Sequence, residues 1–317
     1  MKNNFSDEVN QGLSQENKSL PSKFFYDKRG DDLFVKIMNL PEYYLTNAEF
    51  DIFRNQTDEL INSLQVDPNA YFELIELGAG NGHKTKQLLN ALLENNFDFA
   101  YVPIDISKNA LSLLEHSLSE DLPKLVVNAQ HGDYFGVLDN IKSSEIPKVV
   151  LFLGSNIGNM EDDKAISFMA HLDESLNEKD KVVLGVDLIK PKEIVLPAYN
   201  DPQGITRDFN LNLLRRINEE LGGDFNLNQF EHTPDYSEES GIACSYLTST
   251  IDQKVSIKSL SKDFYFKKGE RIYMEISRKY NDEVLNGILE NTQLEVISKL
   301  VDAKGYFADY VLEKKNH

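Results

Sequence analysis

The stretch FELIELGAGNGHKTKQLL, residues 72–89, decides the fold of this chain. With the preceding tyrosine, its first part reads YFELIEL and predicts a β-strand. Glycines follow at positions 78, 80 and 82, and leucine spacing over 83–95 then predicts a helix. A strand that passes through a glycine turn into a helix indicates an α/β unit whose turn approaches a ligand.

Strands and helices continue to alternate after this unit. We predict strands over 98–106, 124–134, 147–156 and 181–189, and helices over 107–118 and 163–176. The segment PKVVLFLGSN is almost entirely apolar, as in a parallel strand that helices cover on both faces. The sequence therefore predicts a doubly wound α/β sheet. After a helix over 282–290, the strands LEVISKLVD and YFADYVLEK are joined by the short turn AKG into a terminal antiparallel hairpin.

The region before the sheet is less regular. We expect about the first 20 residues to be disordered or loosely helical, because they are polar. A short helix is expected to begin at Asp31 or Asp32. One amphipathic helix is expected over 46–64, with Thr46 or Asn47 as its cap.

The alternation breaks again at Lys190, where a longer and more polar stretch begins. Alternating strands over 242–251, 254–260 and 271–280 follow it. This part of the chain is predicted to be an inserted α+β unit.

Composition limits the class of protein. The net charge of −19 repels phosphate backbones, so nucleic acid is not expected as a substrate. The single cysteine, Cys244, excludes an intrachain disulfide and fits a reducing compartment. No apolar run reaches the about 18 residues of a membrane span, and the polar N-terminus has no apolar signal core. The scattered histidines lack metal-ligand spacing. We expect a cytoplasmic protein without a metal site.

The glycine spacing points to one class of ligand. A dinucleotide fingerprint needs G-x-G-x-x-G, whereas this loop reads G-x-G-x-G, and no Gly-Lys-Ser/Thr of a P-loop follows. S-adenosylmethionine carries no diphosphate and suits such a turn. Asp105, about 25 residues beyond Gly80, has the spacing of a ribose-binding acid. Asp133 and Tyr134 are candidates for the adenine. A glycine turn without a ligand is the alternative, but with these acids and the final hairpin we interpret the fold as a class I methyltransferase.

The chain then resembles a known family. SKFFYDKRGDDLFVKIMNLPEYYLT, ELGAGNGHKT, YVPIDIS, LFLGSNIGN, AYNDPQGITRDFNLNLLRRINEELGGDFNLNQFEH and MEISRKY are similar, in the same order, to segments of the histidine N-alpha-methyltransferases of ergothioneine biosynthesis. The match runs from about residue 20 to about 310. Related fungal dimethylallyltryptophan N-methyltransferases share the architecture. The resemblance implies three methyl transfers from S-adenosylmethionine to the α-amino nitrogen of histidine.

The resemblance also implies roles for single residues. The cofactor-binding positions are Gly78, Gly80, Lys84, Asp105, Asp133, Tyr134 and Gly154. The substrate-binding positions are Tyr26 and Tyr43 beside the substrate, Asn159 and Tyr199 at its carboxylate, and Glu275 and Ser277 at its imidazole. Of these, Tyr43, Asn159 and Tyr199 are the positions expected to act in catalysis.

Without the resemblance, blander interpretations remain for several residues. Glu275 fits a solvent-facing strand position, Asn159 fits a loop cap, and Lys84 fits a solvated charge at a helix start. Two positions depart from the family pattern. Its methionine over the imidazole is replaced by Ser245, or by Cys244 if the register slips by one, and its C-terminal tryptophans are absent because the chain has no tryptophan.

We expect a monomer with two domains. Residues 48–189 and 280–317 form the S-adenosylmethionine-binding methyltransferase domain, and residues 1–47 and 190–279 form the substrate-binding domain. Two alternatives for function stay open at this point. One is an N-methyltransferase for another amino acid or amine, and the other is a non-catalytic protein that binds S-adenosylmethionine or an amino acid.

Overall fold

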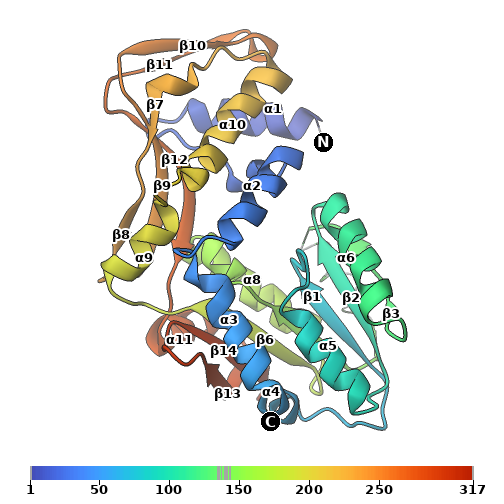
Figure 1. The fold of residues 1–317 in the computed structure, drawn as a ribbon. Coiled ribbons are helices and arrows are strands. Elements are labelled where there is room, and N and C mark those ends of the chain that lie inside the picture. The colour runs from blue at the N-terminus through green and yellow to red at the C-terminus, as the bar shows by residue number, and fades with distance from the viewer. Residues whose placement is uncertain (1, 134–135, 137, 139–141, 143, 316–317) are drawn as a thin grey trace. The chain divides into compact units, whose positions relative to one another are not determined.

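A computed structural model describes residues 2–133, 136, 138, 142 and 144–315 of the chain (Figure 1). The chain forms two compact units. The sheet unit comprises Leu45–Ile189 and Arg278–His317, and the insert unit comprises Met1–Tyr44 and Lys190–Ser277. Each unit is described by itself below.

The sheet unit is built on one mixed sheet with the strand order β13-β14-β6-β5-β1-β2-β3, and β4 also pairs with β2. Neighbouring strands from β3 to β6 are parallel, whereas β14 is antiparallel to both β6 and β13. The predicted doubly wound sheet with a terminal antiparallel hairpin is therefore confirmed. The strands are β1 (Phe72–Leu77), β2 (Phe99–Asp105), β3 (Val126–Val127), β4 (Gln130–His131), β5 (Lys148–Phe152), β6 (Lys181–Asp187), β13 (Leu294–Val301) and β14 (Phe307–Lys314).

Two hydrophobic cores lie on opposite faces of this sheet. Successive strand residues alternate between the two cores. Ile75 and Val150 pack into one core, whereas their neighbours Leu74 and Val149 pack into the other. This alternation explains why the central strands are apolar at nearly every position. The covering helices are α3 (Tyr44–Asn55), α4 (Thr57–Leu64), α5 (Thr85–Glu94), α6 (Lys108–Asp121), η2 (Asn156–Asn159), α8 (Asp162–Ser175) and α11 (Asp282–Leu289).

The order of the strands places a switch point between β1 and β5. The chain moves outward from β1 to β2 and β3, and then returns to the other side of β1 as β5. In open α/β sheets, ligands bind outside the carboxyl ends of the strands at such a point. A ligand site is therefore expected at the loops that follow β1 and β5.

Two helix predictions differ from the structure. The single helix predicted over 46–64 is two helices, α3 and α4, which Gln56 separates. The acidic residues Asp58 and Glu59 stand in the first turn of α4, where the helix dipole favours negative charge and a new helix can begin.

The helix predicted to begin at Asp31 or Asp32 begins earlier, as α2 (Lys28–Met38). Its cap is Asp27, whose carboxylate accepts the amide of Gly30 at 2.7 Å. The N-terminal segment is also helical, because its buried residues Phe5, Val9 and Leu13 recur at a helical spacing.

The insert unit is an α+β unit, as predicted. One sheet has the order β12-β9-β7, with β8 also on β9, and the strands β10 and β11 form a separate ribbon. The strand β11 (Lys262–Phe266) is an addition to the predicted strands. The other elements are α1 (Lys2–Leu13), η1 (Ser22–Phe25), α9 (Lys192–Tyr199), α10 (Ile205–Leu221), η3 (Leu227–Gln229), β7 (Phe230–His232), β8 (Asp235–Ser237), β9 (Ile242–Ser249), β10 (Gln253–Ile257), η4 (Lys258–Leu260) and β12 (Arg271–Arg278). Within the described ranges, none of the helices has the length and apolar run that a membrane crossing demands.

A histidine lies inside the insert unit without a hydrogen-bond partner among the described residues. His232 on β7 is 8% exposed, and both of its ring nitrogens are buried and unpartnered. Burial lowers the pKa of His232 from 6.5 to about 4, and the positive charge of Arg207 lowers it further, against the opposing effect of Asp201. The folded chain therefore excludes a proton that the unfolded chain binds below pH 6.5.

This pKa predicts an acid-sensitive contribution to stability. The contribution of His232 to the free energy of unfolding should fall as pH decreases from 6.5 towards 4, by on the order of 2 kcal/mol at pH 5. In His232→Gln this part of the pH dependence should vanish. Urea unfolding at pH 7 and pH 5 measures it, with His116→Gln at an exposed position as the control. Equal pH slopes for the wild type and His232→Gln would contradict the assignment.

Candidate functional site

The loop after β1 combines close packing with an open backbone. Gly78, Gly80 and Gly82 have φ values of +76°, +53° and +62°, which favour glycine. A β-carbon at Gly82 would lie 2.5 Å from Cδ1 of Leu114 in α6, whereas one at Gly80 would meet no atom within 4 Å. The loop is thus fixed against α6 at its last glycine and leaves backbone uncovered at Gly80.

Asp105 connects this loop to the next strand. Its Oδ2 accepts the amide of Gly80 at 3.0 Å, and its Oδ1 accepts the amide of Ser107 at 2.8 Å. The carboxylate is half-buried at the carboxyl end of β2. Asp133 is exposed and accepts the amide of Gly136 at 3.0 Å. Tyr134, the other predicted adenine contact, lies outside the described residues.

Lys84 and Gly154, two further predicted cofactor residues, come together at one buried carboxylate. The Nζ of Lys84 forms an ion pair with Glu49, which is 1% exposed. The amide of Gly154 donates to Oε1 and Oε2 of Glu49 at 2.8 and 3.1 Å. A β-carbon at Gly154 would lie 3.3 Å from Nζ of Lys84, so the loop after β5 passes close to the start of α5.

Glu49 is a residue that sequence reasoning missed. It belongs to the buried side of α3, together with Leu45, Ala48 and Ile52. A carboxylate on an apolar helix face is the signal that points to it, because such a charge needs a buried partner.

A second buried carboxylate, Glu76, lies at the end of β1. Its Oε1 accepts the hydroxyl of Thr85 at 2.8 Å, and its Oε2 accepts the hydroxyl of Tyr101. Burial raises the pKa of Glu76 to about 7, although both hydrogen bonds and the charge of Lys84 act in the opposite direction. Three elements, β1, β2 and α5, are thus tied together beside the glycine loop.

Asn159 ends the short helix η2 in the loop after β5 and is exposed. The loop is fixed by close packing at Gly158, where a β-carbon would lie 2.6 Å from the carbonyl oxygen of Arg278. The Asn159 amide is therefore presented to solvent by a rigid turn.

In the insert unit, the structure brings two predicted substrate residues into contact. The hydroxyl of Tyr199, at the end of α9, donates to Oγ of Ser277 on β12 at 2.7 Å, and the contact is buried. Glu275 precedes Ser277 by two positions on the same strand, so the two side chains share a face of the sheet.

The position of Ser245 differs from the expectation for a substrate-binding residue. The rings of Tyr246 on β9 and Tyr273 on the neighbouring β12 lie 5.7 Å apart, so these two side chains share a face. By alternation, Cys244 and Glu275 belong to that face, whereas Ser245 is buried on the other one. The sequence left the register open by one residue, and the structure brings Cys244 to the side of Glu275.

The predicted aromatic residues Tyr26 and Tyr43 belong to one aromatic group. The ring of Phe34 lies 5.5 Å from Tyr26 and 6.4 Å from Tyr43, edge to face in both cases. Tyr26 also packs edge to face on Phe209 of α10 at 5.7 Å. Both tyrosines are half-buried, which leaves part of each ring exposed.

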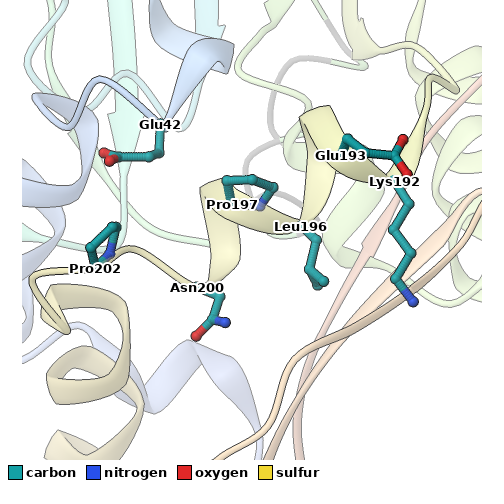
Figure 2. A pocket seen from close by; sticks show the side chains of 7 residues that line it. All are labelled: Glu42, Lys192, Glu193, Leu196, Pro197, Asn200 and Pro202. Atoms are coloured by element: carbon teal, nitrogen blue, oxygen red, sulfur yellow. The ribbon is translucent and has the colours of Figure 1, made fainter.

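A hollow of about 510 Å³ lies beside α9 (Figure 2). The residues that line it are Glu42, Lys192, Glu193, Leu196, Pro197, Asn200 and Pro202. These residues are the sequence neighbours of Tyr43 and Tyr199, but the predicted site residues themselves are not part of the lining. The hollow is therefore distinct from the Tyr199–Ser277 contact.

The residues of the site offer hydrogen bonds, aromatic faces and carboxylates. Among the residues that the structure describes, no three His, Cys, Asp or Glu side chains gather as a metal-binding group. Neutral donors such as Asn159 and Tyr199 suit a carboxylate, and a glutamate beside a serine suits a ring that carries two nitrogens. Within the insert unit alone, Tyr199, Glu275 and Ser277 offer the hydrogen bonds that a small polar molecule needs.

Comparisons with known proteins agree with this chemistry. Residues 5–314 match a family described as histidine-specific, S-adenosylmethionine-dependent methyltransferases. A histidine N-alpha-methyltransferase of Mycolicibacterium smegmatis is 33% identical over 95% of this chain and 92% of its own length. Ergothioneine biosynthesis protein 1 of Schizosaccharomyces pombe is 31% identical over 93% of this chain and 39% of its own length. A 4-dimethylallyltryptophan N-methyltransferase of Claviceps fusiformis is 26% identical over 87% of this chain and 82% of its own length.

The raised pKa of Glu76 predicts a pH effect on stability. The folded chain keeps a proton on Glu76 that the unfolded chain loses above pH 4.5, so the contribution of Glu76 to the free energy of unfolding should fall as pH rises from 4.5 to about 7, opposite in sign to that of His232. The loss should be on the order of 3 kcal/mol. Glu76→Gln should remove this slope, and Glu73→Gln on the same strand should keep it. Urea titrations between pH 5 and 8 measure both, and an unchanged slope in Glu76→Gln would refute the prediction.

Proposed function

Because the chain belongs to the family of histidine-specific, S-adenosylmethionine-dependent methyltransferases, we propose that it methylates the α-amino nitrogen of L-histidine, up to the trimethylated betaine. The observation that carries the proposal is the buried 2.7 Å hydrogen bond from Tyr199 to Ser277. It joins a residue expected at the substrate carboxylate to one expected at the imidazole. The contact therefore brings the groups proposed for the two polar ends of one histidine next to each other.

The residues around the glycine loop fit the methyl donor. The backbone at Gly80 is uncovered, and the Asp105 carboxylate beside it suits the hydroxyls of a ribose. Gly78, Lys84 and Gly154 would complete the donor site, and Asp133 and Tyr134 would contact the adenine. When bound, S-adenosylmethionine supplies an electrophilic methyl group on a sulfonium sulfur.

The task of the protein is mainly to align the amine. Asn159 and Tyr199 would donate hydrogen bonds to the substrate carboxylate, which orients the amino group without a buried positive charge. Fixing two reactants in this way can contribute about 7–11 kcal/mol to lowering the barrier. The attacking nitrogen must be neutral, so a proton leaves it before each transfer; a water molecule would accept this proton, or the Tyr43 hydroxyl would relay it while passing its own proton on.

Aromatic faces suit the growing positive charge. Each methyl group adds apolar surface around the nitrogen, and the final product is a quaternary ammonium. Tyr26 and Tyr43 would stabilise it by cation–π contact, worth about 2 kcal/mol when water is excluded. Their edge-to-face packing on Phe34 holds the rings in place for this role.

Glu275 and Ser277 would recognise the imidazole. The carboxylate of Glu275 accepts one ring N–H, and the hydroxyl of Ser277 serves the other nitrogen. Cys244 shares the face of Glu275 and would form the wall where the family has a methionine. An apolar substrate side chain would leave the Glu275 carboxylate without this partner, which disfavours it.

A panel of the twenty amino acids with S-adenosylmethionine tests the substrate. We expect histidine to gain three methyl groups by mass spectrometry. Glu275→Gln should lower kcat/KM for histidine by about 10- to 100-fold, because a charged hydrogen bond to the ring is lost. Glu231→Gln, an exposed glutamate on β7, is the matched control. Methylation of tryptophan or another amino acid, with histidine inert, would reject the proposal.

The role of Asp105 is tested by donor binding. Asp105→Asn should weaken binding of S-adenosylhomocysteine by about tenfold or more, because a charged acceptor for the ribose hydroxyls is lost. Asp98→Asn, exposed before the opposite end of the same strand, should bind as the wild type does. Calorimetric titration in the absence of histidine measures both. Equal affinities for Asp105→Asn and the wild type would remove Asp105 from the donor site.

The proposal extends to the organisation of the protein. We assign donor binding to residues 48–189 and 280–317 and substrate binding to residues 1–47 and 190–279, in a cytoplasmic monomer. The glycine loop in the sheet unit and the Tyr199–Ser277 contact in the insert unit support this assignment. Light scattering that finds a mass of two or more chains would refute the monomer.

A further inference from the structure

Glu49 joins three segments of the sheet unit. Its own helix is α3, and its two carboxylate oxygens bind the side chain of Lys84 and the backbone amide of Gly154. Lys84 stands at the start of α5, just after the glycine loop, and Gly154 follows β5. One side chain therefore links the two loops that flank the switch point between β1 and β5.

The sheet provides space for this carboxylate by means of a glycine. A β-carbon at Gly185 of β6 would lie 2.4 Å from Oε1 of Glu49 and 2.8 Å from Oδ1 of Asp309. Asp309 is the residue that pairs with Gly185 across β6 and β14. Two carboxylates thus approach each other over the one position of β6 that has no side chain.

The two carboxyl groups differ in their partners. Asp309 is fully buried, and neither of its oxygens has a hydrogen-bond partner among the described residues. Burial and the nearby charge of Glu49 raise the pKa of Asp309 well above its usual range, against the smaller effect of Lys84. Burial thus disfavours the charged form of Asp309, and the carboxylate that pairs with Lys84 is that of Glu49.

We propose that Glu49 is a positioning residue of the donor site, which holds Lys84 and the backbone of Gly154 in the arrangement that S-adenosylmethionine requires. This inference rests on the proposed function, because it deepens the donor site named there. Glu49 itself is buried and acts through its two partners.

The geometry explains why such a residue is needed. A lysine side chain is flexible, and its ordering costs about 2 kcal/mol of rotamer entropy. The ion pair with Glu49 orders the Lys84 side chain before the ligand binds, so its ammonium is already in place at the start of α5. The same carboxylate takes up the amide of Gly154, which fixes the turn at the end of β5 in its left-handed conformation.

Calorimetric titration with S-adenosylmethionine and with S-adenosylhomocysteine, without any amine substrate, tests the proposal. Glu49→Gln keeps the shape of the side chain but leaves the Lys84 ammonium unneutralised. We expect both ligands to bind at least about tenfold more weakly. Glu59→Gln, at an exposed position of α4, should bind them as the wild type does.

A double-mutant cycle with Lys84→Met separates positioning from general stability. If Glu49 acts through Lys84, Glu49→Gln should cost much less donor affinity in the Lys84→Met background than in the wild type. In turnover with saturating histidine and a varied concentration of donor, Glu49→Gln should raise KM for the donor more than it lowers kcat. Additive losses, or a lower melting temperature with unchanged donor affinity, would overturn the proposal.

The outcome is independent of the identity of the acceptor. If histidine proves inert but Glu49→Gln still weakens donor binding through Lys84, the substrate assignment fails and the positioning role stands. If histidine is trimethylated and donor affinity is unaffected by Glu49→Gln, the positioning role fails alone.

Discussion

The parallel pairing of β1 with β2 on one side and with β5 on the other is the constraint on which the donor site depends. It brings the carboxyl ends of three strands to one edge, where the glycine loop, Asp105 and Gly154 follow them. The hydrogen bond from Gly80 to Asp105 then ties the first two of these ends together. Strand order decides which side chains can meet a ligand, and the loop sequences decide the chemistry they offer.

Buried carboxylates hold this edge in place. Glu76 binds hydroxyls from α5 and β2, and Glu49 binds Lys84 and the amide of Gly154. Removing a charge from water is costly, so donors from neighbouring segments stabilise these two carboxyl groups in the core. Hydrogen bonds depend on direction, so these carboxyl groups fix the positions of the loops more closely than apolar packing alone would.

In the insert unit, strand alternation decides which side chains lie on the same face. Ser277 and Glu275 share one face of β12, and the neighbouring strand brings Cys244 to that face and turns Ser245 away. A shift of one residue exchanges the two faces of a strand, so the side chain that lies beside Glu275 follows from the pairing of β9 with β12.

The sequence by itself determined the doubly wound sheet, its terminal hairpin and the family, because these follow from hydrophobic periodicity and from motifs that are local in the chain. It also pointed to Asp105, since a carboxylate after the second strand must lie near the first loop. Only the tertiary structure revealed the partners of Glu49. Lys84, Gly154 and Asp309 lie 35, 105 and 260 positions away from it in the sequence. Only strand pairing could decide between Cys244 and Ser245. Contacts between distant segments depend on how layers pack, and no local pattern carries that information.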